Sequence, residues 1–374
     1  MTTSTRASAN KKQNSSAGGA PPASDAEPGS KHKVEEGAPS PEAKRAKKEP
    51  AEEENQKTTE EAKNEAPKKE EEAENKQPAA TDDKGEAVEP HEAPESIPSS
   101  IVEKGIIYFF FRGRVNIEKP SEVNEIARSY IILRPIAKDV QLGSGTIGDA
   151  GNSRLCVIPK KVLPQTGKDR WISFVEKTGA SFQQLKDEFL ASNDYETKTV
   201  GTRHTPAATP IGEGVYAITN TGKESHLAYI LTLPEELGEV QKEIGLKEKG
   251  SFIISTRNPQ YEPPKNARLS KGPEYPKDLL EEFRSLRWAP TQPKHLDYVN
   301  TQFLLVGESS GIDKALEPQE KDQKEGKGEP ADELEKLEEE DYERMKDLSQ
   351  DDAGRIFADL QVHAGEYPKL QTTF

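Results

Sequence analysis

Apolar residues concentrate in the middle of the chain, between residues 96 and 308. The run GIIYFFFRGRV at 105–115 is apolar on both faces, which predicts a buried strand at the centre of a sheet. Other short runs, rich in β-branched and aromatic residues, end at proline, glycine or polar turns, as strands do. The predicted strands lie within residues 105–115, 129–135, 154–161, 170–177, 214–220, 225–233, 251–257 and 303–308. The segment TGKE at 221–224 predicts a hairpin between two of them.

Helical periodicity is confined to a few short segments. Ser181 and Gln184 fit a capping box and predict a helix there, and Pro234 and Pro276 mark the starts of two more. A further short helix is predicted from apolar residues at helical spacing: Val123, Ile126, Ala127 and Tyr130. The pattern therefore predicts one α+β domain over residues 96–308, with a mixed, mainly antiparallel set of strands and three or four helices.

The net charge of −15 over 374 residues is carried by the two flanks. Residues 1–95 have 15 basic and 22 acidic side chains, a net charge of −7. Residues 96–308 have 28 and 26, a net of +2, and residues 309–374 have 9 and 19, a net of −10. The first flank is a low-complexity polyampholyte that cannot bury enough apolar surface to offset the entropy of ordering, so we expect it to be disordered.

The second flank divides into two parts. Residues 309–330 read as a polar linker, and residues 331–374 as an acidic, helix-prone tail in which Asp341 interrupts a coiled-coil pattern. Three apolar residues further on lie at helical spacing: Ile356, Phe357 and Leu360. They fit either a short partner-binding helix or a segment that folds back on the domain, and the sequence leaves both interpretations open.

Two features bear on the compartment. The chain has no run of about 18 apolar residues and no apolar segment behind its first basic residues, so we expect no membrane span and no secretory signal. The single cysteine, Cys156, lies in the apolar run LCVI and cannot form an internal disulfide. We expect it to be a core residue of a protein from a reducing compartment.

A compact basic cluster in the first flank, PEAKRAKKEP at 41–50, is bracketed by prolines in an otherwise acidic segment. With two lysines upstream it has the spacing of a bipartite nuclear localisation signal, formed by Lys31, Lys33, Lys44, Arg45, Lys47 and Lys48. The alternative is a solvated charge run. The cluster indicates a nuclear import receptor as a partner and the nucleus as the main location, with a cytoplasmic pool possible.

Residues 200–214 lack periodicity and predict a long loop, which in a compact domain is usually functional or disordered. The candidate ligand residues in and near this loop are Arg203, His204, Thr205, Glu213 and His226. They could bind an anion or share a proton, or they could simply belong to a hydrogen-bonded loop that packs across the sheet. The histidine spacings match no metal-ligand pattern, so we expect no metal and no cofactor.

Basic residues also gather in the first half of the predicted domain. The candidate basic face consists of Arg112, Arg114, Lys160, Lys161 and Arg170. On one surface with Phe111 or Trp171, these side chains could bind a nucleic-acid backbone. Nearby acidic residues make ordinary mixed surface charge the alternative.

Several segments carry a family resemblance: GTRHTPAATPIGEGVYAIT, ESHLAYILTLPEELGEVQKE, SFIISTRNP, KGPEYP, LDYVNTQFLLVGE and LPQTGKDRWISFVEK. They resemble an uncharacterised family common in filamentous fungi, whose members often carry the label "BTB domain transcription factor", and shorter bacterial and archaeal proteins look similar. The resemblance covers roughly residues 100–308. The helix-rich BTB pattern is absent from this strand-rich sequence, and the family implies no activity or catalytic residues.

No motif for catalysis emerges. GSGTIGDAG at 143–151 lacks the Lys-Ser/Thr of a phosphate-binding loop, and GESSG at 307–311 lacks the helix that follows a nucleophile elbow. We therefore expect a nuclear, non-enzymatic binding protein, a candidate for association with transcription or chromatin, whose domain binds a protein or a nucleic acid. The alternative function is a small-molecule or anion-binding domain centred on residues 202–214, with enzymatic activity left open.

Overall fold

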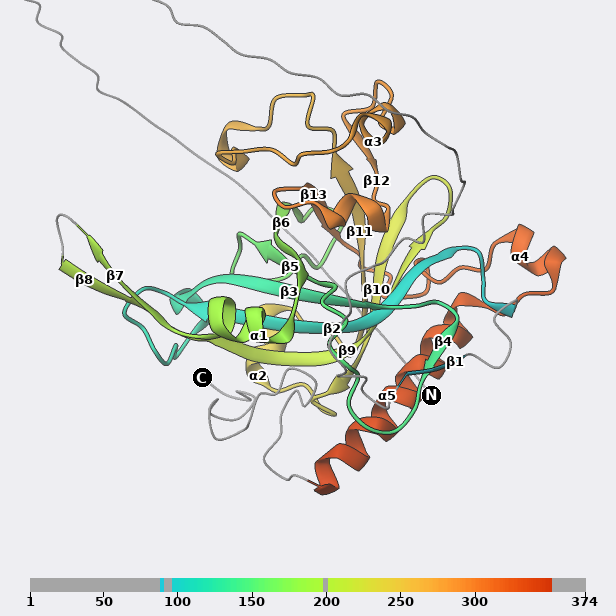
Figure 1. The fold of residues 1–374 in the computed structure, drawn as a ribbon, viewed down its shortest axis with the longest axis horizontal. Coiled ribbons are helices and arrows are strands. Elements are labelled where there is room, and N and C mark those ends of the chain that lie inside the picture. The colour runs from blue at the N-terminus through green and yellow to red at the C-terminus, as the bar shows by residue number, and fades with distance from the viewer. Residues whose placement is uncertain (1–87, 91–95, 198–200, 352–374) are drawn as a thin grey trace, which may run out of the picture. The chain divides into compact units, whose positions relative to one another are not determined.

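Strands dominate the secondary structure of this protein, whose computed structural model describes residues 88–90, 96–197 and 201–351 (Figure 1). The strands are β1 Val88–Pro90, β2 Ile101–Gly113, β3 Ile126–Ile136, β4 Val140–Leu142, β5 Ser153–Ile158, β6 Arg170–Ala180, β7 Asn193–Thr197, β8 Gly201–Thr205, β9 Ala208–Asn220, β10 Ser225–Leu233, β11 Lys249–Arg257, β12 Trp288–Pro290 and β13 Gln302–Gly307. The α-helices are α1 Phe182–Leu185, α2 Glu239–Ile244, α3 Lys277–Glu282, α4 Glu320–Glu325 and α5 Pro330–Asp351.

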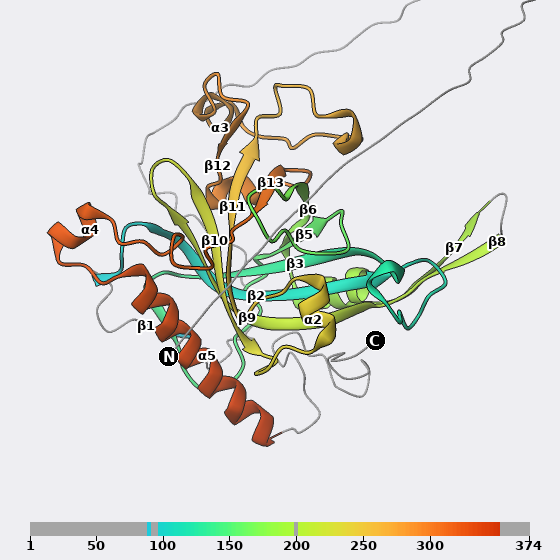
Figure 2. The same cartoon turned by 180° about the vertical axis from the view of Figure 1, so that it is seen from behind.

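Eight of the strands form a closed antiparallel barrel. Their order is β10-β9-β2-β3-β5-β6-β13-β11, and pairing of β11 with β10 closes the ring. The short strand β12 is added along the edge of β11. The hairpin β7–β8 is a separate two-stranded sheet that extends away from the barrel in both views (Figures 1 and 2).

The alternating side chains of the barrel strands fill two separate apolar cores. On β2, Ile107, Phe109 and Phe111 belong to a cluster that draws residues from all eight strands, so this cluster fills the barrel interior. The intervening residues of β2, such as Tyr108 and Phe110, belong to a second cluster outside the barrel, which α1 and α5 cover. A strand buried on both faces explains why its sequence is continuously apolar.

The C-terminal part of the described chain packs on the outer core. Leu334 and Leu337 of α5 are almost fully buried there, and Figure 2 shows this helix running alongside the strands. Glu333 forms an ion pair of 2.7 Å with Lys104 of β2. Residues 309–330, which the sequence suggested as a linker, contain α4 and the buried Leu316. The tail residues Ile356, Phe357 and Leu360 lie outside the described residues.

The predicted α+β class is wrong, because the domain is a mostly β structure built on the closed eight-stranded barrel. Within the described residues, α5 is the only α-helix longer than six residues. The helices expected at Pro234 and Pro276 shorten to α2 and α3, and the one at Ser181 is a single capped turn followed by a π-helical turn. Apolar spacing over a few residues does not separate a helix from a strand, and barrel pairing decided the outcome.

The predicted secondary structure is wrong in two further segments. The helix expected around Val123–Tyr130 is instead a 3-10 turn at Val123–Glu125 followed by β3, whose backbone pairs with β2. The long loop expected at 200–214 consists mainly of strands β8 and β9. None of the helices in the described part of the chain is long and apolar enough to cross a membrane.

Candidate anion-binding site

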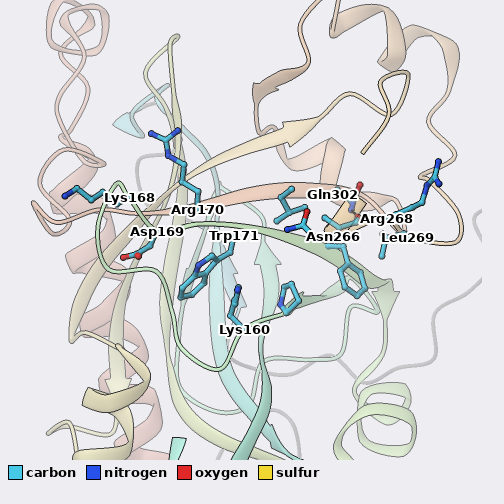
Figure 3. A pocket seen from close by; sticks show the side chains of 13 residues that line it. Lys160, Lys168, Asp169, Arg170, Trp171, Asn266, Arg268, Leu269 and Gln302 are labelled. Atoms are coloured by element: carbon cyan, nitrogen blue, oxygen red, sulfur yellow. Dashed lines mark hydrogen bonds between the residues drawn. The ribbon is translucent and has the colours of Figure 1, made fainter. Parts of the chain in front are cut away.

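A cleft of about 620 Å³ opens on the barrel wall beside β6 (Figure 3). Four parts of the chain line it: the residues after β5, the start of β6, the segment that follows β11, and one residue of β13. The lining residues are Pro159, Lys160, Lys168, Asp169, Arg170, Trp171, Ile172, Phe174, Asn266, Ala267, Arg268, Leu269 and Gln302. These parts are far apart in sequence, and the β6–β13 and β13–β11 pairings bring them together.

The charge of the cleft is opposite to that of the whole chain. Four exposed cations, Lys160, Lys168, Arg170 and Arg268, line it with one carboxylate, Asp169, so the lining has a formal net charge of +3 against −15 for the chain. Among the described residues none of these four side chains forms an ion pair, and Arg170 Nε only donates to the Gly167 carbonyl at 3.1 Å. Cations without acidic partners create a field that attracts an anion.

The carboxylate of Asp169 is held by the turn that precedes β6. Its Oδ2 accepts from the backbone N–H groups of Thr166 at 2.9 Å and Gln165 at 3.1 Å, and from the Thr166 hydroxyl at 3.1 Å. These hydrogen bonds lower the pKa of Asp169. The carboxylate therefore stabilises the turn that presents Lys168 and Arg170, while N–H donors rather than these cations balance its charge.

Two aromatic residues lie among the cations. Trp171 is half-buried at the rim of the barrel interior, and Phe174 is half-buried against the outer core. Both residues also line the cleft. Half-exposed aromatic rings provide flat apolar surfaces for planar ligands.

A buried arginine positions the wall opposite β6. Arg257, at the end of β11, donates from Nε to Gln302 Oε1 at 2.7 Å and from Nη1 to the Tyr261 carbonyl. Gln302 Nε2 in turn donates to the Ala267 carbonyl at 2.5 Å. Burial lowers the pKa of Arg257, which nevertheless stays protonated because guanidinium is so basic. This chain of hydrogen bonds fixes the segment that carries Asn266 and Arg268.

Only part of the predicted basic face lines the cleft. Lys160 and Arg170 share the cleft, but Arg112 donates to the Phe189 carbonyl and its guanidinium lies 5.4 Å from that ring. Lys161 donates to the Asn124 carbonyl at 2.8 Å. Arg114 follows the end of β2 and does not line the cleft.

The residues of the predicted ligand loop do not come together in one site. Arg203, His204 and Thr205 lie on the hairpin strand β8, where His204 Nδ1 is 2.5 Å from Asp194 Oδ1. His204 Nε2 is 2.7 Å from Glu118 Oε1.

By contrast, Glu213 and His226 are fully buried in the barrel strands β9 and β10. Burial lowers the pKa of His226, which lies 3.8 Å from Glu224. No group of three or more His, Cys, Asp or Glu side chains suited to a metal occurs in the described ranges. The nuclear-import cluster falls outside those ranges: Lys31, Lys33, Lys44, Arg45, Lys47 and Lys48.

Sequence reasoning missed Arg257, Asn266, Arg268 and Gln302. One signal was present, because KNARLSKG at 265–272 carries three cations spaced three residues apart and no acidic residue. The prolines on either side of that segment are typical of a connection between elements, and nothing local shows that it faces β6.

Comparisons with protein-family models, with curated proteins and with solved structures find no match to this chain.

Proposed function

We propose that this protein binds the phosphate backbone of a nucleic acid through the cleft beside β6. One observation carries the proposal: Lys160, Lys168, Arg170 and Arg268 line one cleft together with two aromatic residues, and within the described residues none of these cations has an acidic partner, although the chain has a net charge of −15. Phosphate groups along a nucleic acid can each release counterions on meeting such cations, which is the main source of backbone affinity.

The geometry favours this function over the ligand-loop alternative. Binding at residues 202–214 would require Arg203 and His204 to meet Glu213 and His226, but the first two lie on a projecting hairpin and the others are buried in the barrel. A protein with an acidic face would also fit a cationic cleft, and failure of the protein to bind a nucleic acid at low salt would favour that partner.

The same proposal places the protein in the nucleus. Its support is the basic cluster at 41–50, which has the composition and spacing that import receptors bind. A nuclear location would bring the cleft into contact with nucleic acids. A fluorescent fusion of the protein is expected to lose its nuclear accumulation when four residues are changed to Ala: Lys44, Arg45, Lys47 and Lys48. Unchanged accumulation would contradict the proposed nuclear location.

The binding test uses the full-length chain with those four tail cations already changed to Ala, so that the tail cannot supply the affinity. Binding of a labelled single strand is followed by anisotropy over a salt series. If all four cleft cations meet phosphates, the slope of log K against log salt is about −2.8, from about −0.7 per phosphate contact.

Two variants locate the binding. Changing both Lys168 and Arg170 to Ala is expected to reduce the slope by about 1.4 and to weaken binding at low salt. Changing both Lys321 and Lys324 to Ala is the matched control, because these are two exposed cations on α4 outside the cleft. Equal slopes for the double variant and the control would refute the proposal.

A further inference from the structure

We infer that the cleft accepts a single-stranded segment with one unstacked base laid against Trp171, rather than a double helix. This inference rests on the proposed backbone binding and specifies which form of nucleic acid the site takes. The inference follows from the positions of the cations, the aromatic residues and the Asn266 carboxamide in the cleft.

The cations flank the aromatic residues. In the view of Figure 3, Lys168 and Arg170 lie toward one end of the cleft and Arg268 toward the other, with Trp171 and Lys160 between them. A nucleotide within a strand has a phosphate on each side of its sugar and base. The arrangement therefore matches one base in the middle and its neighbouring phosphates at the two ends.

The volume of the cleft also favours a single strand over a double helix. Its volume of about 620 Å³ lies in the range of pockets that enclose small organic ligands. A base within a double helix is stacked and paired, so its flat face cannot enter such a pocket, whereas a single strand presents its bases to aromatic side chains. A duplex would contact only the cations at the rim.

One polar group in the cleft remains available for a base edge. Both functional atoms of the Gln302 carboxamide are used, because Oε1 accepts from Arg257 and Nε2 donates to Ala267. Asn266 is exposed on the 3-10 turn Lys265–Ala267, and its carboxamide makes no hydrogen bond to any other described residue. A carboxamide can donate and accept at once, as the edge of a base requires.

The first test compares Trp171→Leu with Trp288→Phe in the full-length, tail-neutralised protein. Leucine keeps apolar bulk against the barrel but removes the ring, and a thermal melt confirms that the variant is folded. Affinity for a single strand of about 12 nucleotides is expected to fall by about 5- to 150-fold in Trp171→Leu, the usual effect of removing one stacked base. Duplex affinity is expected to change less than about 2-fold, because only the rim cations meet it.

Intrinsic fluorescence gives a second readout, because Trp171 and Trp288 are the protein's two tryptophans. Stacking of a base on Trp171 quenches its emission, so addition of the single strand is expected to quench Trp288→Phe and to leave Trp171→Leu unchanged. Quenching of equal size in both variants would overturn the inference.

A strand of abasic sugar-phosphates of the same length separates this inference from the proposed function. It keeps the phosphates and lacks the bases, so it is expected to bind more weakly than the natural strand and to be insensitive to Trp171→Leu. If it binds as tightly as the natural strand and still depends on Lys168 and Arg170, backbone binding stands and base stacking is refuted. If neither strand binds in low salt, both proposals fall.

Discussion

The buried imidazole of His295 makes folding stability depend on pH, and the dependence can be worked out from its contacts. Its Nδ1 accepts a hydrogen bond from the backbone N–H of Gln292, with an N···N distance of 3.1 Å, and lies 3.1 Å from the Thr256 hydroxyl oxygen. Its ring stacks on Phe283 with centroids 5.0 Å apart. An Nδ1 that accepts from a backbone N–H cannot carry a proton, so the folded protein holds His295 neutral.

Burial lowers the pKa of His295 from 6.5 to about 4, while Glu282 raises it and Lys294 lowers it. Because the folded value lies below the unfolded one, the unfolded chain binds more protons between pH 6.5 and pH 4. The contribution of His295 to stability is therefore complete above about pH 6.5 and is lost as the pH falls through this window. A difference of one between the folded and unfolded pKa values corresponds to about 1.4 kcal/mol, so the loss reaches about 3 kcal/mol near pH 4.

The assay is urea unfolding followed by circular dichroism at several values between about pH 7 and pH 4. Other groups also contribute to the pH dependence, among them His226, whose pKa burial also lowers, so the wild-type protein is compared with His295→Gln. Glutamine can accept the Gln292 N–H but does not titrate. The wild-type curve is expected to fall about 3 kcal/mol further than the variant's. If the unfolding free energies of the two proteins fall by the same amount between pH 7 and pH 4, the role given to His295 is refuted.

Three further predictions concern other buried groups. Asp341 of α5 accepts hydrogen bonds from Thr232 and Arg344 in a fully buried site, so Asp341→Ala should cost about 3–5 kcal/mol in urea unfolding, and a cost below about 1 kcal/mol would contradict the docking of α5. In the barrel interior Arg154 donates to Glu103 at 2.7 Å, so Arg154→Met should cost a similar amount and a second change, Glu103→Gln, should recover part of it in the same assay. Gln302→Leu should weaken single-strand binding in anisotropy, because it removes the link that fixes the segment with Asn266 and Arg268; unchanged affinity would show that this link does not shape the cleft.

Local sequence signals predicted the elements that local interactions determine. The continuous apolar run of β2 is buried on both faces, and the capping box of Ser181 and Gln184 is present in full. The hairpin between β9 and β10 also forms, closed by a hydrogen bond from Thr221 N to Glu224 O. Each of these depends on residues that are close together in the sequence.

The errors arose where distant pairing decides the structure. The lack of periodicity over residues 200–214 predicted a loop, yet β9 extends through Pro210 because a register shift against β2 accommodates the proline. The cleft depends on the same kind of pairing. Lys160 and Arg170 were candidates for one basic face, but their meeting with Arg268 requires the order β6-β13-β11 around the barrel, which no local pattern reveals.

The most direct test of the central claim is to map where a single strand touches the protein. The full-length chain is cross-linked by ultraviolet light to a single strand, digested, and analysed by mass spectrometry. Cross-linked peptides are expected from the start of β6, which carries Trp171, and from residues 264–269. Cross-links confined to the β7–β8 hairpin or to the basic cluster at 41–50 would contradict the claim.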